Sequence, residues 1–251
     1  FANTNTFYGA SIRYVPTGNY YVMVYMRALS SSNRYLRALI VTVDASGNIS
    51  LGSESQVNGS NSVQEYTTVY DPDEDKVLIM YTDSQSGYVL KTRYAYSTNS
   101  SSSAGSVTFG SNTTLSSTTG NPEHLAIAYN KGINKFMMMY QSSGLRVRVG
   151  TGSSGSVSWT GETVIDSNNT SESLIAADGT SSFITYFRDR SGGSDNNKGV
   201  MRGVSVSGTT PSAGSRVLVG SQELQGSPQM FLEYHEGSSV CRFNVHTINY
   251  L

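Results

Sequence analysis

The chain repeats one combination of residues five times, a tyrosine followed by an arginine. The two residues of a pair are 12, 12, 8, 16 and 8 positions apart, so the separations differ by multiples of four. A Ser or Gly occupies the midpoint of every pair, which predicts a β-hairpin there. Because side chains alternate faces along a strand, lengthening a hairpin by four residues keeps the same two residues opposite each other. The pattern predicts cross-strand pairs of Tyr25 with Arg37, Tyr81 with Arg93, Tyr140 with Arg148, Tyr186 with Arg202 and Tyr234 with Arg242.

Each tyrosine lies in an apolar segment, which predicts a strand buried on both faces. An alternating segment precedes this strand, the arginine strand follows it, and a fourth segment follows a glycine. Each repeat is therefore expected to form a four-stranded antiparallel meander. The apolar strands are predicted at 20–26, 77–81, 136–140, 183–187 and 230–234.

Successive arginines of the pairs are 56, 55, 54 and 40 residues apart, a period typical of one four-stranded propeller blade. The predicted fold class is therefore all-β, a single β-propeller domain over 1–251, with five blades as the favoured number. An open array, a β-sandwich with long hairpins and a fragment of a larger propeller remain alternatives. The predicted repeat units are 1–57, 58–115, 116–165, 166–219 and 220–251.

The fifth repeat has no evident fourth strand, and Phe1 aligns with Val57, which ends a fourth strand. We therefore expect residues 1–7 to lie beside the 240–249 strand, in the same molecule or in a neighbouring copy. The first residues lack an initiator Met and a leader pattern, which indicates a processed chain or a piece of a longer one.

The composition argues against several classes of partner. Charged residues make up 14% of the chain and the formal net charge is -1, so neither nucleic acid nor an anionic membrane is an expected partner. No apolar run approaches the length of a membrane-spanning helix. The single cysteine excludes an intrachain disulfide.

The ten Tyr and Arg residues of the pairs have two interpretations. As framework, an arginine over a tyrosine ring supports the sheet by about 0.5–1 kcal/mol per pair. As binding residues, aromatic faces and guanidinium donors would bind glycans at equivalent sites. The framework interpretation is favoured, because a feature present in every repeat usually builds the repeat.

The acidic turn at 71–75 resembles the start of a calcium loop, but it lacks the later Gly and Glu of an EF-hand. A Pro-containing turn without metal is therefore predicted. The polar segment 189–198 is predicted to be a flexible hairpin tip.

No catalytic motif stands out, and no catalytic residue or cofactor is predicted. His235 is expected opposite Cys241, yet one such contact without an orienting residue is more typical of strand neighbours than of a nucleophile pair. A propeller glycosidase remains an alternative, because its acidic residues come from different blades and leave no local motif.

Tyr70-Asp71-Pro72, Lys76-Val77, Tyr81 and the segment 107–111 together resemble tandem propeller-type repeats of phage tail, fibre and other surface-exposed proteins. The likeness is best over 57–165. It implies a virion-surface or extracellular location, with other copies of the chain or neighbouring structural proteins as partners. We therefore predict a non-enzymatic structural or adhesion module, with a multivalent carbohydrate-binding lectin and a glycosidase as alternatives.

Overall fold

The computed structural model describes residues 6–28, 33–84, 88–98, 104–115, 121–219, 229–235 and 240–246. These residues form strands and turns, and none of them belongs to a helix that could cross a membrane. The chain divides into two compact units, each of which is described by itself. Unit 1 comprises Phe1–Ser117 with Gly152–Val157, and unit 2 comprises Thr118–Thr151 with Ser158–Leu251.

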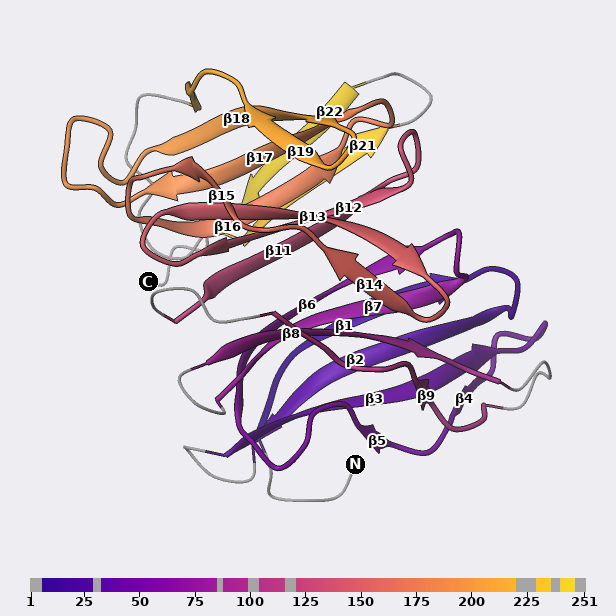
Figure 1. The fold of residues 1–251 in the computed structure, drawn as a ribbon. Coiled ribbons are helices and arrows are strands. Elements are labelled where there is room, and N and C mark those ends of the chain that lie inside the picture. Colours follow the sequence, from indigo (N-terminus) through magenta and orange to yellow (C-terminus); the bar gives the residue numbers. More distant parts are fainter. Residues whose placement is uncertain are drawn as a thin grey trace. The chain divides into compact units, whose positions relative to one another are not determined.

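Unit 1 contains two antiparallel sheets, here called sheet 1 and sheet 2 (Figure 1). In each sheet the strands follow one another in chain order as a meander. Sheet 1 consists of β1 (Thr6–Val15), β2 (Tyr20–Ala28), β3 (Arg34–Val43), β4 (Ile49–Leu51) and β5 (Ser55–Gln56). Sheet 2 consists of β6 (Val63–Asp71), β7 (Lys76–Asp83), β8 (Val89–Tyr96), β9 (Thr108–Phe109) and β10 (Thr113–Leu115).

Unit 2 contains two further meanders, sheet 3 and sheet 4, and a terminal hairpin. Sheet 3 consists of β11 (Glu123–Asn130), β12 (Lys135–Gln141), β13 (Leu145–Ser153), β14 (Ser156–Trp159) and β15 (Thr163–Asp166). The tip of the β13–β14 hairpin, Gly152–Val157, is counted with unit 1. Sheet 4 consists of β16 (Thr170–Ala177), β17 (Ser182–Asp189), β18 (Gly199–Ser207), β19 (Thr210–Ala213) and β20 (Val217–Val219). The hairpin pairs β21 (Gln229–His235) with β22 (Val240–His246).

The apolar second strands supply the cores, as their composition predicts. Met137, Met138 and Met139 of β12 are all fully buried, and β7 is buried along nearly its whole length. One apolar cluster joins sheets 1 and 2, and another joins sheets 3 and 4. A strand that is apolar on both faces can pack against neighbours on both sides, so the sheets stack face to face.

The fourth strand of every sheet is interrupted, which the sequence did not predict. Two short strands pair with the same third strand, as β4 and β5 do with β3. A backbone amide within the break still donates to the third strand, as from Gly52 to the Ile40 carbonyl at 2.8 Å and from Gly110 to the Tyr94 carbonyl at 2.9 Å. A Cβ on Gly52 would lie 2.0 Å from the carbonyl oxygen of Gly105, so only glycine fits.

The predicted fold class is confirmed: the chain is all-β and is built of four-stranded antiparallel meanders of the propeller type. The number of five blades and the single domain stay predictions. Residues 1–5, at the centre of the predicted closure, lie outside the described residues. Thr6 and Phe7, however, pair with Ala28 and Arg27 of β2, so they belong to the first strand of sheet 1.

Candidate functional site

The predicted Tyr/Arg pairs form directly in only one sheet. Tyr25 lies opposite Arg37, as expected. In the other hairpins the loop is not centred on the midpoint of the pair, so the register moves by one or two residues. Arg93 lies opposite Ile79, Arg148 opposite Met138, Arg202 opposite Thr185 and Arg242 opposite Glu233.

The tyrosine hydroxyls have polar partners in the break of the fourth strand, and sequence reasoning missed these partners. Tyr25 donates to Glu54, Tyr140 donates to Glu162, and Tyr81 donates to Asn112 Oδ1 at 3.0 Å. Burial raises the pKa of Tyr81 to about 12. The sequence could have indicated these partners, because Glu54, Asn112 and Glu162 each lie one or two positions after the glycine of the fourth segment.

The arginines complete the same clusters. Arg148 donates from Nε to the Tyr140 hydroxyl at 3.1 Å and pairs with Glu162 at 3.2 Å. Arg93 donates to the carbonyls of Val57 and Gly110 at 2.6 and 3.0 Å. The contacts with Glu162 and Gly110 tie the third strand to the broken fourth strand of the same sheet, whereas Val57 directly follows β5 of sheet 1.

The four tyrosines in sheets 1 to 4 are at most 2% exposed, so protein covers their rings. This burial favours the framework interpretation of Tyr25, Tyr81, Tyr140 and Tyr186. A ligand-binding role of the ten residues is not tested and stays a prediction.

The acidic turn is tied together by its own backbone. Asp71 is buried and accepts the amides of Asp73 and Glu74 at 3.0 and 3.4 Å. Burial raises the pKa of Asp71. Within the described residues, no three His, Cys, Asp or Glu side chains form a group suited to a metal ion.

The predicted contact between His235 and Cys241 does not form as a direct cross-strand pair. In the terminal hairpin His235 lies opposite Val240, and Cys241 lies opposite Tyr234. The register is one residue away from the expected one, so the two residues of the predicted pair are not directly opposite each other.

A polar pocket of about 510 Å³ lies in unit 2, and we call it the unit 2 pocket. It forms where the first strands of sheets 3 and 4 begin and their second strands end. Because these strands are antiparallel, the start of β11 lies beside the end of β12, and the start of β16 beside the end of β17. Its lining comprises Glu123, His124, Gln141, Asn169, Thr170, Ser171, Glu172, Arg188 and Arg190.

Two residues of the pocket have a backbone conformation that is unusual for their type. A β-bulge interrupts the register of β11 between Glu123 and Ala126, and another interrupts β16 between Ser171 and Leu174. His124 and Glu172, within these bulges, both have a φ of 55°. Every other described non-glycine residue with positive φ lies between strands, and the corresponding bulge of β1 has Gly9. Such a conformation costs about 1–3 kcal/mol in a non-glycine residue and is concentrated at functional sites.

Gln141 connects the two sides of the pocket. It is 8% exposed, donates from Nε2 to Asn169 Oδ1 at 2.9 Å, and accepts the Thr170 amide at 3.2 Å on Oε1. The end of sheet 3 is thereby joined to the start of sheet 4. Nearby, the buried hydroxyl oxygen of Ser171 has no hydrogen-bond partner among the residues that the structure describes.

The charged groups of the pocket fall into two arrangements. Glu172 pairs with Arg188, whose Nη1 lies 3.1 Å from Glu172 Oε1. Asn197 Oδ1 accepts from both Arg188 Nη2 at 3.1 Å and Arg190 Nη1 at 3.3 Å. Glu123, from the other sheet, is exposed and has no ion pair with any described residue.

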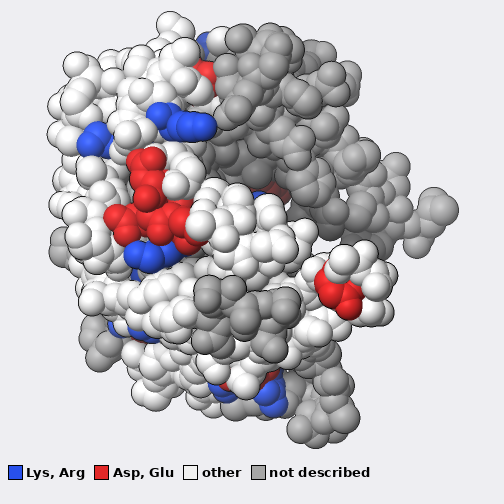
Figure 2. All heavy atoms as spheres, turned by 90° about the vertical axis from the view of Figure 1, so that its right-hand side faces the viewer, with Lys and Arg blue, Asp and Glu red and all other residues white. Residues whose placement is uncertain are grey.

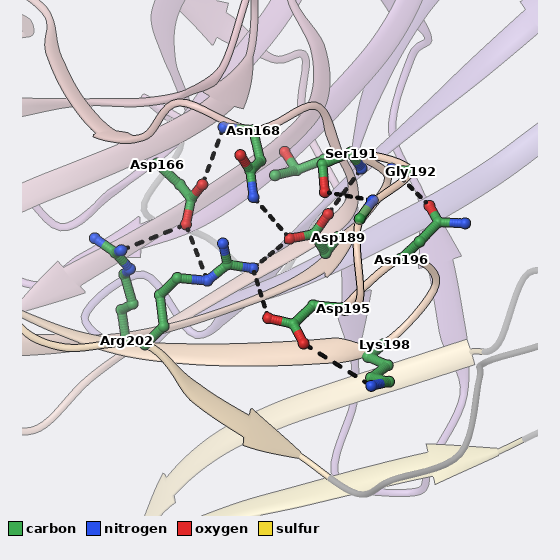
Figure 3. A network of polar contacts seen from close by, with 12 residues as sticks. Asp166, Asn168, Asp189, Ser191, Gly192, Asp195, Asn196, Lys198 and Arg202 are labelled. Atoms are coloured by element: carbon green, nitrogen blue, oxygen red, sulfur yellow. Dashed lines mark hydrogen bonds and ion pairs between the residues drawn. The ribbon is translucent and has the colours of Figure 1, made fainter.

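The segment 189–198, predicted to be a flexible tip, is held by an ordered network (Figure 3). Asp189 is fully buried and accepts from the Ser191 amide at 2.7 Å, from Asn168 Nδ2 at 2.9 Å and from Arg216. Burial opposes ionisation, but these hydrogen bonds outweigh it and lower the pKa of Asp189 to about 2. The segment is the hairpin tip between β17 and β18, as predicted, and the buried Asp189 anchors it at its start; its flexibility stays a prediction.

Charges of both signs occur on the drawn face. Figure 2 shows one acidic group between basic ones and a second acidic group among uncharged atoms, with wide uncharged areas elsewhere. An extended field of one sign, as nucleic acid would require, is not visible on that face.

A smaller cavity of about 320 Å³ in unit 1 also contains two carboxylates, Glu74 and Asp75. Both are engaged by neighbours. Glu74 pairs with Lys76 at 2.9 Å and accepts the Ser154 amide at 2.9 Å, and Asp75 accepts the Tyr70 hydroxyl at 2.6 Å. In the unit 2 pocket one carboxylate, Glu123, has no ion pair with a described residue, so this pocket is the better candidate for chemistry on a ligand.

No family model and no curated protein matches this chain. Among solved structures, it is similar to a GH43 β-1,3-galactosidase determined with galactodeoxynojirimycin. The two are 11% identical, the match covers 83% of this chain and 75% of the galactosidase, and the TM-score is 0.48, so the likeness concerns the fold. The resemblance to phage tail and fibre repeats stays a prediction.

This comparison corrects the sequence-based prediction of function. The prediction of a non-catalytic structural or adhesion module, with no enzymatic activity, is not upheld, since the solved structure of similar fold is a glycosidase. This likeness concerns the fold and assigns no activity to the chain. Whether this chain has such an activity depends on its own residues.

Proposed function

We propose that the unit 2 pocket binds a glycan and that the chain hydrolyses a glycosidic bond there. The observation that carries the proposal is the pair of bulges with His124 and Glu172 at a φ of 55°, in adjacent sheets and beside the same pocket. Bulges redirect side chains next to active sites, and the strain they hold is retained where function requires it.

The lining suits a sugar. Hydroxyl, amide, carboxylate and guanidinium groups surround the cavity, so they can donate to and accept from the hydroxyl groups of a glycan. Gln141 and Asn169 are held by each other at 2.9 Å, which fixes part of this lining before a ligand arrives.

Glycoside hydrolysis requires two carboxyl groups on either side of the bond. Glu123 and Glu172 come from different sheets and line one cavity. We assign Glu123 as the acid that gives its proton to the leaving glycosidic oxygen. Glu172, beside the Arg188 guanidinium, either takes a proton from the water that attacks the anomeric carbon, or attacks that carbon itself. In the second case water hydrolyses the resulting glycosyl-enzyme bond, with Glu123 as the base that takes its proton.

The test is release of reducing ends from a panel of oligosaccharides, with wild type compared with Glu123→Gln and Glu172→Gln. Each substitution keeps the side-chain shape and removes the acid or base function. We expect the rate to fall by about 10²–10⁴-fold in both variants.

Glu65→Gln is the matched control, because Glu65 lies within the bulge of β6 and does not line the unit 2 pocket. Its activity should equal that of wild type. Full activity in Glu172→Gln, or an equal loss in all three variants, would contradict the assignment. Glycan binding by wild type without any hydrolysis would contradict the enzymatic proposal and leave a lectin-like role.

A further inference from the structure

Arg190 is an exposed cation at the unit 2 pocket that lacks an acidic partner in the described part of the chain. Its backbone is fixed, because the Arg190 amide donates to the Asn169 carbonyl at 2.8 Å. Its side chain makes a hydrogen bond of 3.3 Å to Asn197 Oδ1. A guanidinium has five N–H donors, so most of them face no described acceptor.

The acids nearest in sequence are already engaged. Asp189 is buried against Arg216, Asn168 and Ser191. Asp195 lies 3.8 Å from Lys198 and 4.0 Å from Arg216. These carboxylates therefore do not neutralise Arg190.

Two guanidinium groups converge on one neutral oxygen. Arg188 and Arg190 both donate to Asn197 Oδ1, and only Arg188 has a carboxylate partner, Glu172. Among the described residues, the sheet 4 side of the pocket therefore carries one positive charge, that of Arg190, which no ion pair neutralises. On the sheet 3 side, Glu123 forms no ion pair with Arg190. His124 is the residue that follows Glu123 in the sequence.

We propose that Arg190 recognises an anionic substituent, a carboxylate or a sulfate ester, on the glycan that occupies the unit 2 pocket. This inference rests on the proposed function, since it names the class of glycan that the same pocket takes. A planar guanidinium can form two parallel hydrogen bonds with either group, and Asn197 orients it for that contact. The substrate class is an acidic glycan.

Calorimetric binding tests the inference with S-linked trisaccharides, which resist hydrolysis. One contains a uronic acid, the second is its carboxyl-reduced neutral counterpart, and the third is that neutral sugar with one sulfate ester. We expect at least one acidic ligand to bind about tenfold more tightly than the neutral one, with the preference weakened by added salt. Whichever acidic ligand binds more tightly, the uronic acid or the sulfate ester, identifies the preferred anion.

Arg190→Gln should abolish this preference, and Arg190→Lys should restore part of it. Lys131→Gln, at an exposed turn outside the pocket, should leave the preference unchanged. Equal affinity for acidic and neutral ligands, or a preference that survives Arg190→Gln, would overturn the inference. If the inference about Arg190 fails, hydrolysis of neutral glycans would still support the proposed function. If acidic glycans bind but are not hydrolysed, the role of Arg190 would be supported and the enzymatic proposal contradicted.

Discussion

Replacing Asp189 with Asn should destabilise unit 2 in a pH-dependent way. Asp189 is fully buried and holds the 189–198 segment through Ser191, Asn168 and Arg216 (Figure 3). A pKa of about 2 against the ordinary 3.8 corresponds to between about 2 and 3 kcal/mol of stability at most. Solvent near the partially exposed Arg216 reduces this, so we expect about 1–2 kcal/mol at neutral pH.

The sign of the pH dependence follows from the direction of the shift. A carboxyl with a lowered pKa in the folded state stabilises the fold at pH values above its unfolded pKa, and this contribution is lost as pH falls toward the folded pKa. The difference between wild type and Asp189→Asn should therefore be complete at pH 6 and should decline between about pH 4 and pH 2.

Urea denaturation at several pH values provides the measurement. The matched control is Asp195→Asn in the same segment, because Asp195 is 33% exposed and its ion-pair contacts are 3.8 and 4.0 Å long. We expect this control to cost less than about 0.5 kcal/mol. Equal effects of the two variants, or a cost of Asp189→Asn that does not change with pH, would refute this account of the network.

Four further outcomes follow from the structure. Arg93→Ala should cost about 1–3 kcal/mol in urea denaturation, because the carbonyls of Val57 and Gly110 lose a charged donor; an unchanged unfolding midpoint would contradict its framework role. Tyr140→Phe should cost about 1–2 kcal/mol by the same assay, because Glu162 and Arg148 both lose the hydroxyl, and no loss would argue against the cluster. His124→Gly should change the free energy of unfolding by no more than about 1 kcal/mol, because glycine relieves the strain of the left-handed conformation but gives the unfolded chain more freedom. Glycan affinity should fall, and undiminished binding in calorimetry would contradict a role for the bulge. Added calcium should leave the melting temperature unchanged in wild type and in Asp73→Ala, since Asp71 already accepts two turn amides, and a calcium-dependent rise abolished in Asp73→Ala would contradict this.

Much of the fold could be predicted from local pattern. The runs around Met138 and Leu78 are apolar at successive positions, and such strands are buried on both faces wherever they pack between sheets. Turns with Gly, Pro, Asn and Asp marked the hairpins. These features depend on neighbours in sequence, so a single sequence was sufficient to identify them.

Register could not be predicted in the same way. The Tyr/Arg spacing located the hairpins, but loop geometry decided that Arg148 lies opposite Met138 and not opposite Tyr140. A shift of two residues kept Arg148 on the face of Tyr140, whereas a shift of one placed Arg202 and Tyr186 on opposite faces.

The candidate site escaped sequence analysis for a related reason. Glu123 and Glu172 are 49 positions apart and belong to no motif. They come together because the starts of two first strands meet at one end of adjacent sheets, and because each start contains a bulge. A bulge adds one residue to one strand without a clear sequence signal when that residue is Glu or His.

The most direct measurement is a crystal structure of Glu172→Gln with an acidic trisaccharide bound. The account predicts that the sugar lies in the unit 2 pocket, with its glycosidic oxygen beside Glu123 and its anionic group on Arg190. A sugar bound elsewhere on the chain, with the unit 2 pocket empty at saturating ligand, would contradict the account.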